Sequence, residues 1–250
     1  MIGIIDSGCG GFNVICECLK YYNEDFVYLI DNKNCPYGNK KEKDLKKILK
    51  QNIDYLIKKY DLDLIIIGCN TLSCFVDYEF MQKYKIPILK TVPNLNEKDC
   101  DKILVFATKN TLKNCKLIEY CYKTNKNVKF VYIKDLPKLI DQNISNDYSF
   151  NEQINKKLLK VFCRNSELKF ANVGAISLGC THFKFIKPNL KNILKNFKIL
   201  ECETLVAYNS KFLVRKNKSD FSIKLEFTLK DEKLEKAVKN LIKNIKKEQK

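Results

Sequence analysis

Two cysteines stand at the ends of apolar runs that read almost alike. The first run is IIIGCNT at residues 65–71, and the second is ISLGCTH at residues 176–182. A continuous apolar run is typical of a buried strand, so Cys69 and Cys180 are predicted at the carboxyl ends of two strands. In parallel α/β sheets, ligands bind at that end of the strands. The repeated pattern therefore predicts a thiol at the same place in each of two related units.

Two thiols that approach one carbon from opposite sides could invert its configuration. One, as the thiolate, would remove a proton from one face, and the other, as the thiol, would deliver a proton to the opposite face. A free cysteine is only a few per cent thiolate at neutral pH, so the base needs help. Helix N-termini directly after Cys69 and Cys180 would favour the thiolate. Asp6, at a neighbouring strand end, and His182, the only histidine, are the candidate partners of Cys69 and Cys180, respectively.

Each of these residues also has an ordinary structural explanation. A cysteine at a strand end is by default a small buried residue. A lone histidine such as His182 more often serves the structure, and Asp6 could begin a turn or cap a helix. The catalytic interpretation is favoured because the two cysteines share one sequence context at matching places.

The elements that must position these residues alternate between strands and helices, and the cycle runs twice. Strands are predicted at 1–6, 26–31, 62–68 and 86–90, and again at 102–111, 128–134, 173–179 and 197–201. Helices are predicted at 11–22, 41–60 and 72–84, then in a segment through Tyr122, at 150–163 and after residue 179. Residues 222–245 read as a further strand, turn and helix that returns to the first unit.

Strands alternating with helices indicate parallel sheets with right-handed crossovers. The predicted fold class is therefore α/β, with two similar domains that are each a parallel-sheet three-layer sandwich and with the active site in the cleft between them. We place the first domain at 1–92 plus 208–250 and the second at 93–207.

Composition narrows the class of protein. Apolar residues make up 45% of the 250, enough for a packed core, and no run approaches the ~18–20 apolar residues of a membrane span. The start lacks a basic leader, so we expect a cytoplasmic protein. The 12 cysteines contain no C-x-x-C pair, and with a single histidine we expect no metal site and no disulfide framework.

The net charge of +17 could indicate a nucleic-acid surface. Almost all of the positive charge is lysine, however, and the only arginines are Arg164 and Arg215. Nucleic-acid readers favour arginine for bidentate contacts, so nucleic acid is not expected as the primary partner.

The glycine-rich turn DSGCGGF invites comparison with dinucleotide-binding loops. Its third glycine position is Asn13, so the G-x-G-x-x-G fingerprint is not met, and no Walker-type G-K-[ST] occurs. We therefore expect no nucleotide cofactor, although the backbone amides of the turn could hold a carboxylate.

Together, five stretches resemble the cofactor-independent glutamate racemases. They are IGIIDSGCGGF, FVYLIDNKNCPYG, LIIIGCNTLS, FATKNT and ISLGCTHF, in the order and at about the spacing of that family, over roughly residues 1–200. The resemblance implies two α/β domains around an active site, with Cys69 and Cys180 as the acid and base, assisted by Asp6 and His182. It implies no cofactor and no metal.

The same resemblance implies which residues hold the substrate. The residues that would bind the carboxylates and ammonium of glutamate are Asp6, Ser7, Tyr37, Gly38, Asn70, Thr71, Thr111, Thr181 and His182. It also implies a cytoplasmic homodimer that supplies D-glutamate, typically for peptidoglycan. Two departures stand out: the family usually has Glu where this chain has Asp141, and Asp-Ser where it has Glu201-Cys202.

Two other functions stay open at this point. A racemase for aspartate or another amino acid would also use two opposed cysteines, although His182 and the DSGCGGF turn favour glutamate. A protein of a different class, a non-catalytic regulator that binds nucleic acid or protein, could retain the fold, but the intact cysteine pair argues against it.

Overall fold

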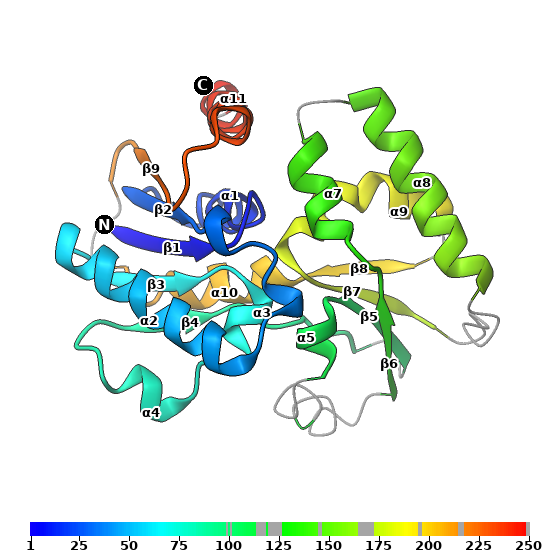
Figure 1. Cartoon of the computed structure of the whole chain (residues 1–250), viewed down its shortest axis with the longest axis horizontal. Coiled ribbons are helices and arrows are strands. Elements are labelled where there is room, and N and C mark those ends of the chain that lie inside the picture. The colour runs from blue at the N-terminus through cyan, green and yellow to red at the C-terminus, as the bar shows by residue number, and fades with distance from the viewer. Residues whose placement is uncertain are drawn as a thin grey trace.

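The computed structural model describes residues 1–98, 100, 102–113, 119, 127–144, 147–164, 173–194, 197–214 and 218–248. Its strands form two separate sheets, which lie side by side and are each flanked by helices (Figure 1). All the strand pairings within both sheets are parallel. Among the described residues, no helix is long and apolar enough to cross a membrane.

The first sheet has the strand order β4-β3-β1-β2-β9. Its strands are β1 (Ile2–Asp6), β2 (Phe26–Ile30), β3 (Leu64–Ile67), β4 (Ile88–Lys90) and β9 (Ile223–Phe227). Every residue of β1, β2 and β3 is buried, as their unbroken apolar runs predict.

Successive side chains of β1 serve opposite faces of this sheet, because strand side chains alternate. Ile4 belongs to the apolar cluster that includes helix α1 (Gly11–Cys18), whereas Ile5 belongs to the cluster that includes α2 (Glu42–Lys59). Each helix therefore covers one face of the sheet.

The second sheet has the order β6-β5-β7-β8. Its strands are β5 (Lys102–Ala107), β6 (Asn127–Tyr132), β7 (Ala175–Gly179) and β8 (Lys198–Glu201). β7 lies beside β5 as β3 lies beside β1, so the two strands that precede the paired cysteines hold matching places in the two sheets.

The helices around the second sheet are α5 (Lys109–Leu112), α7 (Leu136–Asn143), α8 (Asp147–Arg164), α9 (Lys187–Ile193) and α10 (Cys202–Ser210). We call the first sheet with its helices the first half of the molecule, and the second sheet with its helices the second half. Apolar residues of α7, α8 and α9 join the same buried cluster as α1, so one core runs through both halves. The predicted strand at 102–111 ends earlier, at Ala107, and α5 takes up its last residues. Most of the helix predicted after it, through Tyr122, lies outside the described residues.

The predicted helix at 72–84 is wrong. The chain forms two short helices instead, α3 (Asn70–Ser73) and α4 (Tyr78–Met81). Asp77 explains the restart, because its carboxylate accepts a hydrogen bond from the backbone N–H of Phe80 at 2.9 Å and caps α4. After β7 the chain makes a six-residue 3₁₀ helix, η3 (Thr181–Ile186), before α9.

The last segment returns to the first sheet. β9 pairs in parallel with β2, with Ile223 opposite Phe26, and α11 (Glu232–Glu248) follows it. Helix α10 packs against α1, so the boundary that we predict near residue 208 falls within a helix that contacts the first half. The domain boundaries themselves stay a prediction.

The stability of the first sheet is expected to depend on β3. Ile66 is fully buried between the sheet and its helices, so Ile66→Ala should lower the free energy of unfolding by about 2–5 kcal/mol. Leu229→Ala is the control, because Leu229 is 54% exposed and its loss should change little. Urea unfolding of both variants checks this, and equal midpoints would contradict the expected packing of β3.

Candidate active site

A pocket opens between the two halves, at the carboxyl ends of both sheets. Of the residues predicted for the site, Ser7, Tyr37, Gly38, Cys69, Thr71, Cys180 and His182 line it. The others, Asp6, Asn70, Thr111 and Thr181, are buried and do not line it. The remaining lining residues are Cys35, Pro36, Asn39, Thr108, Lys109, Tyr132, Ile133, Asp135, Pro137 and Lys138.

Cys69 and Cys180 face this one pocket from different halves. Each is only 7% exposed, and each is the residue directly before a short helix, α3 for Cys69 and η3 for Cys180. Burial raises the pKa of the Cys69 thiol well above its usual value, and the nearby charge of Asp6 raises it further. Backbone N–H groups of Leu72 and Thr71 oppose this rise but do not overcome it. Cys69 therefore holds its proton: the helix that follows does favour the thiolate, as expected, but burial outweighs it.

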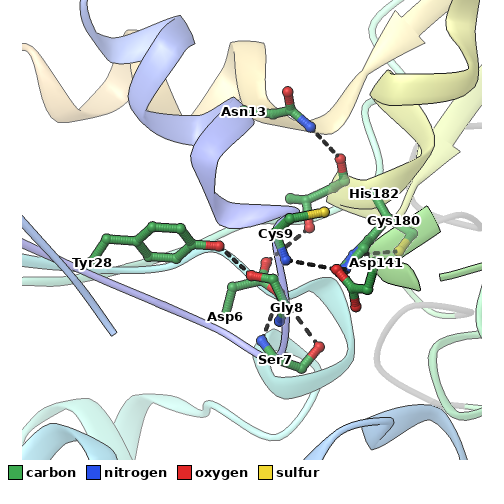
Figure 2. A network of polar contacts seen from close by, with 10 residues as sticks. Asp6, Ser7, Gly8, Cys9, Asn13, Tyr28, Asp141, Cys180 and His182 are labelled. Carbon is green, nitrogen blue, oxygen red and sulfur yellow. Dashed lines mark hydrogen bonds and ion pairs between the residues drawn. The ribbon is translucent and has the colours of Figure 1, made fainter. Parts of the chain in front are cut away.

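His182 lies between Cys180 and Asp141 (Figure 2). Its Nδ1 is 3.8 Å from Cys180 Sγ, and its Nε2 is 3.1 Å and 3.2 Å from the two Asp141 oxygens. Burial lowers the pKa of His182, but the charge and hydrogen bond of Asp141 outweigh it and raise the pKa well above its usual value. Burial likewise raises the pKa of Asp141, and the His182 cation overcomes this, so the net pKa is lowered. The buried imidazole and the half-buried carboxylate form an ion pair.

Asp6 ties the two halves together. It is fully buried, and Thr181 Oγ1 from the second half donates a hydrogen bond to its Oδ2 at 2.9 Å. The backbone N–H groups of Ser7 and Gly8 donate to its other oxygen, at 2.6 Å and 3.2 Å. Burial raises the pKa of Asp6, and the His182 charge and these hydrogen bonds oppose the rise without reversing it.

The glycine-rich turn after β1 lets residues of the second half approach it closely. A Cβ at Gly8 would lie 2.6 Å from Asp141 Oδ1, and a Cβ at Gly10 would lie 2.6 Å from His182 Nδ1. Both glycines are needed because a side chain would displace these groups. The backbone N–H of Cys9 donates to Asp141 at 2.8 Å (Figure 2), so the carboxylate held by this turn is the protein's own.

Cys9, Asp141 and His182 are also the described residues whose atoms could together hold a metal ion. One ligand atom from each lies within 4.8 Å of the others. The ion pair between Asp141 and His182, and the hydrogen bond from Cys9 to Asp141, account for this closeness, so the group is satisfied as a hydrogen-bonded network.

Three threonine hydroxyls meet where the halves touch. Thr71 Oγ1 is 2.8 Å from Thr108 Oγ1 and 3.3 Å from Thr111 Oγ1, and the last two are 3.0 Å apart. Thr111, predicted in the pocket, is fully buried and instead supports Thr71 and Thr108, which do line it.

Asn70 turns away from the pocket. Its Nδ2 donates to Cys202 Sγ at 3.2 Å, and the Cys202 thiol is 3.6 Å from Glu203 Oε2. Cys202, one of the departures noted in the sequence, is thus a buried hydrogen-bond partner. The other departure, Glu201, forms ion pairs with Lys184, at 2.7 Å, and with Lys187.

Sequence reasoning missed Cys35, which places a third thiol in the pocket. Burial raises the pKa of Cys35 to about 12, and the Asp141 charge adds to the rise, so this thiol keeps its proton. The signal was its place in the stretch NCPYG, beside Tyr37 and Gly38. Lys109 and Lys138, also missed, bring positive charge to the same pocket, where an anionic substrate would enter.

Comparisons with known proteins agree on one family. The chain is 33% identical over 205 residues to the glutamate racemase of Clostridium botulinum (strain Kyoto / Type A2), covering 78% of this chain and 76% of the relative. It is 32% identical over 229 residues to the glutamate racemase of Clostridium novyi (strain NT), covering 87% and 85%. No protein-family model matches the chain.

A solved structure shows the same fold. Escherichia coli glutamate racemase, crystallised with L-glutamate and the activator UDP-MurNAc-Ala, superposes with a TM-score of 0.81 at 19% sequence identity, covering 97% of this chain and 94% of that one. This likeness and the two parallel sheets confirm the predicted α/β class.

The ion pair of His182 gives a prediction about its titration. In Asp141→Asn the carboxylate that raises the pKa is removed and burial remains, so the imidazole should lose its proton at a lower pH than in the wild type. His182 is the only histidine, so its Cε1–H signal in tag-free protein is unambiguous by NMR. An unchanged titration midpoint would mean that Asp141 does not control the charge of His182.

Proposed function

This chain belongs to the glutamate racemase family, and from that premise we propose that it interconverts L- and D-glutamate with Cys69 and Cys180 as the two acid–base groups. The observation that supports this mechanism is the presence of both thiols in one pocket, each contributed by the matching strand end of a different sheet. A substrate between them would present opposite faces of its α-carbon to the two sulfur atoms.

Each direction of the racemisation requires one thiolate and one thiol. The thiolate takes the α-proton, and the thiol on the other side gives its proton to the resulting carbanion. Cys69, whose pKa is raised by burial, is suited to be the proton donor. When Cys69 is the base instead, the substrate ammonium would favour its thiolate, because an opposite charge nearby lowers the pKa of a thiol.

His182 and Asp6 have different supporting parts in this scheme. His182 Nδ1, 3.8 Å from Cys180 Sγ, can donate a proton to that sulfur, because Asp141 keeps the imidazole charged and oriented. Asp6 acts on the other side as a negative charge near Cys69. It also holds Thr181, the residue next to Cys180, through a hydrogen bond.

Polar groups of the pocket would hold the charged ends of glutamate. We propose that Ser7, Thr71 and the backbone of Tyr37 and Gly38 bind its carboxylates and ammonium, because these groups line the pocket. Asn70, Thr111 and Thr181, which are buried and do not line the pocket, would hold the lining residues in place. No cofactor is invoked, since thiols of suitable protonation can carry out both proton transfers.

We also propose that the enzyme works in the cytoplasm as a homodimer and supplies D-glutamate for peptidoglycan. Membership of the glutamate racemase family supports this. Size-exclusion chromatography with light scattering would measure the oligomeric state directly.

The two thiols are tested with L-glutamate in D₂O. Wild type should exchange the α-proton for deuterium and form D-glutamate, whereas Cys69→Ala and Cys180→Ala should each lose racemisation by at least about 10²–10⁴-fold, because each removes one proton carrier. NMR of the α-proton and optical rotation follow the two events.

Cys35→Ala is the matched control, since it removes a third thiol from the same pocket. It should keep most of the activity, because Cys35 follows neither β3 nor β7, the strands that present the two proposed acid–base thiols. Racemisation that survives in the Cys69 or Cys180 variant would exclude the two-thiol mechanism. Turnover of aspartate in preference to glutamate would assign the chain a different substrate.

A further inference from the structure

We propose that Asn110 is a positioning residue that latches the pocket-lining loop of the first half onto the second half, and that it sets how tightly substrate binds. This inference rests on the glutamate racemase activity proposed above. Its basis is one side chain with two hydrogen bonds: Asn110 Nδ2 donates to the carbonyl oxygen of Tyr37 at 2.9 Å and to that of Lys40 at 2.8 Å.

The two acceptor carbonyls lie at the two ends of one short turn. The 3₁₀ helix η2 (Tyr37–Asn39) follows β2 of the first sheet, and Lys40 is the residue directly after it. Asn110 lies in α5, directly after β5 of the second sheet. The carboxamide has two N–H hydrogens, and the two carbonyls use both of them. One side chain of the second half therefore holds both ends of a turn in the first half.

The held turn forms one wall of the pocket. Tyr37, Gly38 and Asn39 line the pocket, and so do Thr108 and Lys109, the two residues directly before Asn110. A separation of η2 from α5 would therefore open the pocket at this wall. Asn110 itself does not line the pocket, so its effect on substrate can be separated from direct contact.

The turn is fixed independently at its tyrosine. The Tyr37 hydroxyl donates to Asp31, and Asp31 also accepts from Asn52 at 3.2 Å and from Thr228 at 2.7 Å. These partners all belong to the first half, so they hold the turn in place without joining it to α5. Joining the turn to α5 depends on Asn110 and on the packing of Gly38 against Thr108, where a Cβ would lie 3.2 Å from Thr108 Cβ.

Loss of the two Asn110 hydrogen bonds should raise KM more than it lowers kcat. If the closed arrangement is populated for only a fraction of the time, the apparent dissociation constant rises by the inverse of that fraction. The thiols, His182 and Asp141 are positioned by other contacts, so the proton transfers in the closed state should be unaffected.

The test compares Asn110→Asp, Asn110→Ser and Gln51→Glu. In Asn110→Asp a carboxylate faces two carbonyl oxygens, so we expect the KM for L-glutamate to rise about tenfold and kcat to change less than threefold. Asn110→Ser removes the two donors without adding charge and should shift KM in the same direction by a smaller factor. Gln51→Glu makes the same change from amide to acid at an exposed position of α2, and it should leave both constants unchanged.

Hydrogen exchange supplies the readout that a general loss of stability would not give. The backbone N–H of Lys40, which bonds to Tyr37 oxygen at 3.1 Å, should exchange faster in both Asn110 variants, while amides of β1 and β7 should not. A KM within twofold of wild type would overturn the proposal, as would a raised KM without faster exchange at residues 37–40. If the wild type fails to racemise glutamate, the proposed function fails, and the exchange data still decide whether Asn110 holds the turn.

Discussion

The hydrogen bond from Thr181 to Asp6 is the contact on which the geometry of the pocket depends. It joins the residue after Cys180 to the end of β1, at 2.9 Å and out of reach of solvent. Asn13 reinforces it by donating to the carbonyl oxygen of Thr181 at 2.8 Å. For these groups to meet, the turn after β1 must lie against the second half without side chains at Gly8 and Gly10. The two sheets are thereby fixed so that both thiols open into one pocket.

Burial disfavours the charged form of a group in this pocket, whereas an oppositely charged partner favours it. Which effect is larger differs from group to group. His182 is buried and Asp141 is half-buried, and both remain charged because each has the other as a partner. For Cys69, burial outweighs the backbone N–H groups that favour the thiolate, so the neutral thiol is favoured. In the proposed mechanism, such a pocket would offer a protonated thiol at Cys69 and a charged imidazole beside Cys180.

Runs of apolar residues in the sequence predicted the strands, because a strand's burial is visible in its own residues. The unbroken apolar runs before Cys69 and Cys180 predicted β3 and β7, because strands buried on both faces carry apolar side chains throughout. The same patterns missed the break within 72–84, since it depends on one capping carboxylate. They also could not show that Thr111 supports the pocket from behind or that Cys35 enters it. Both facts follow from how segments far apart in sequence pack together.

The place of β9 in the first sheet has a consequence for synthesis on the ribosome. β2 emerges early, yet its parallel partner is made only after the whole second sheet. Until then the edge of β2 has unpaired backbone groups, which is the kind of surface that pairs with other chains. The nascent chain thus carries an open strand edge through most of its translation. A chaperone that shields this edge would protect the half-made protein from aggregation.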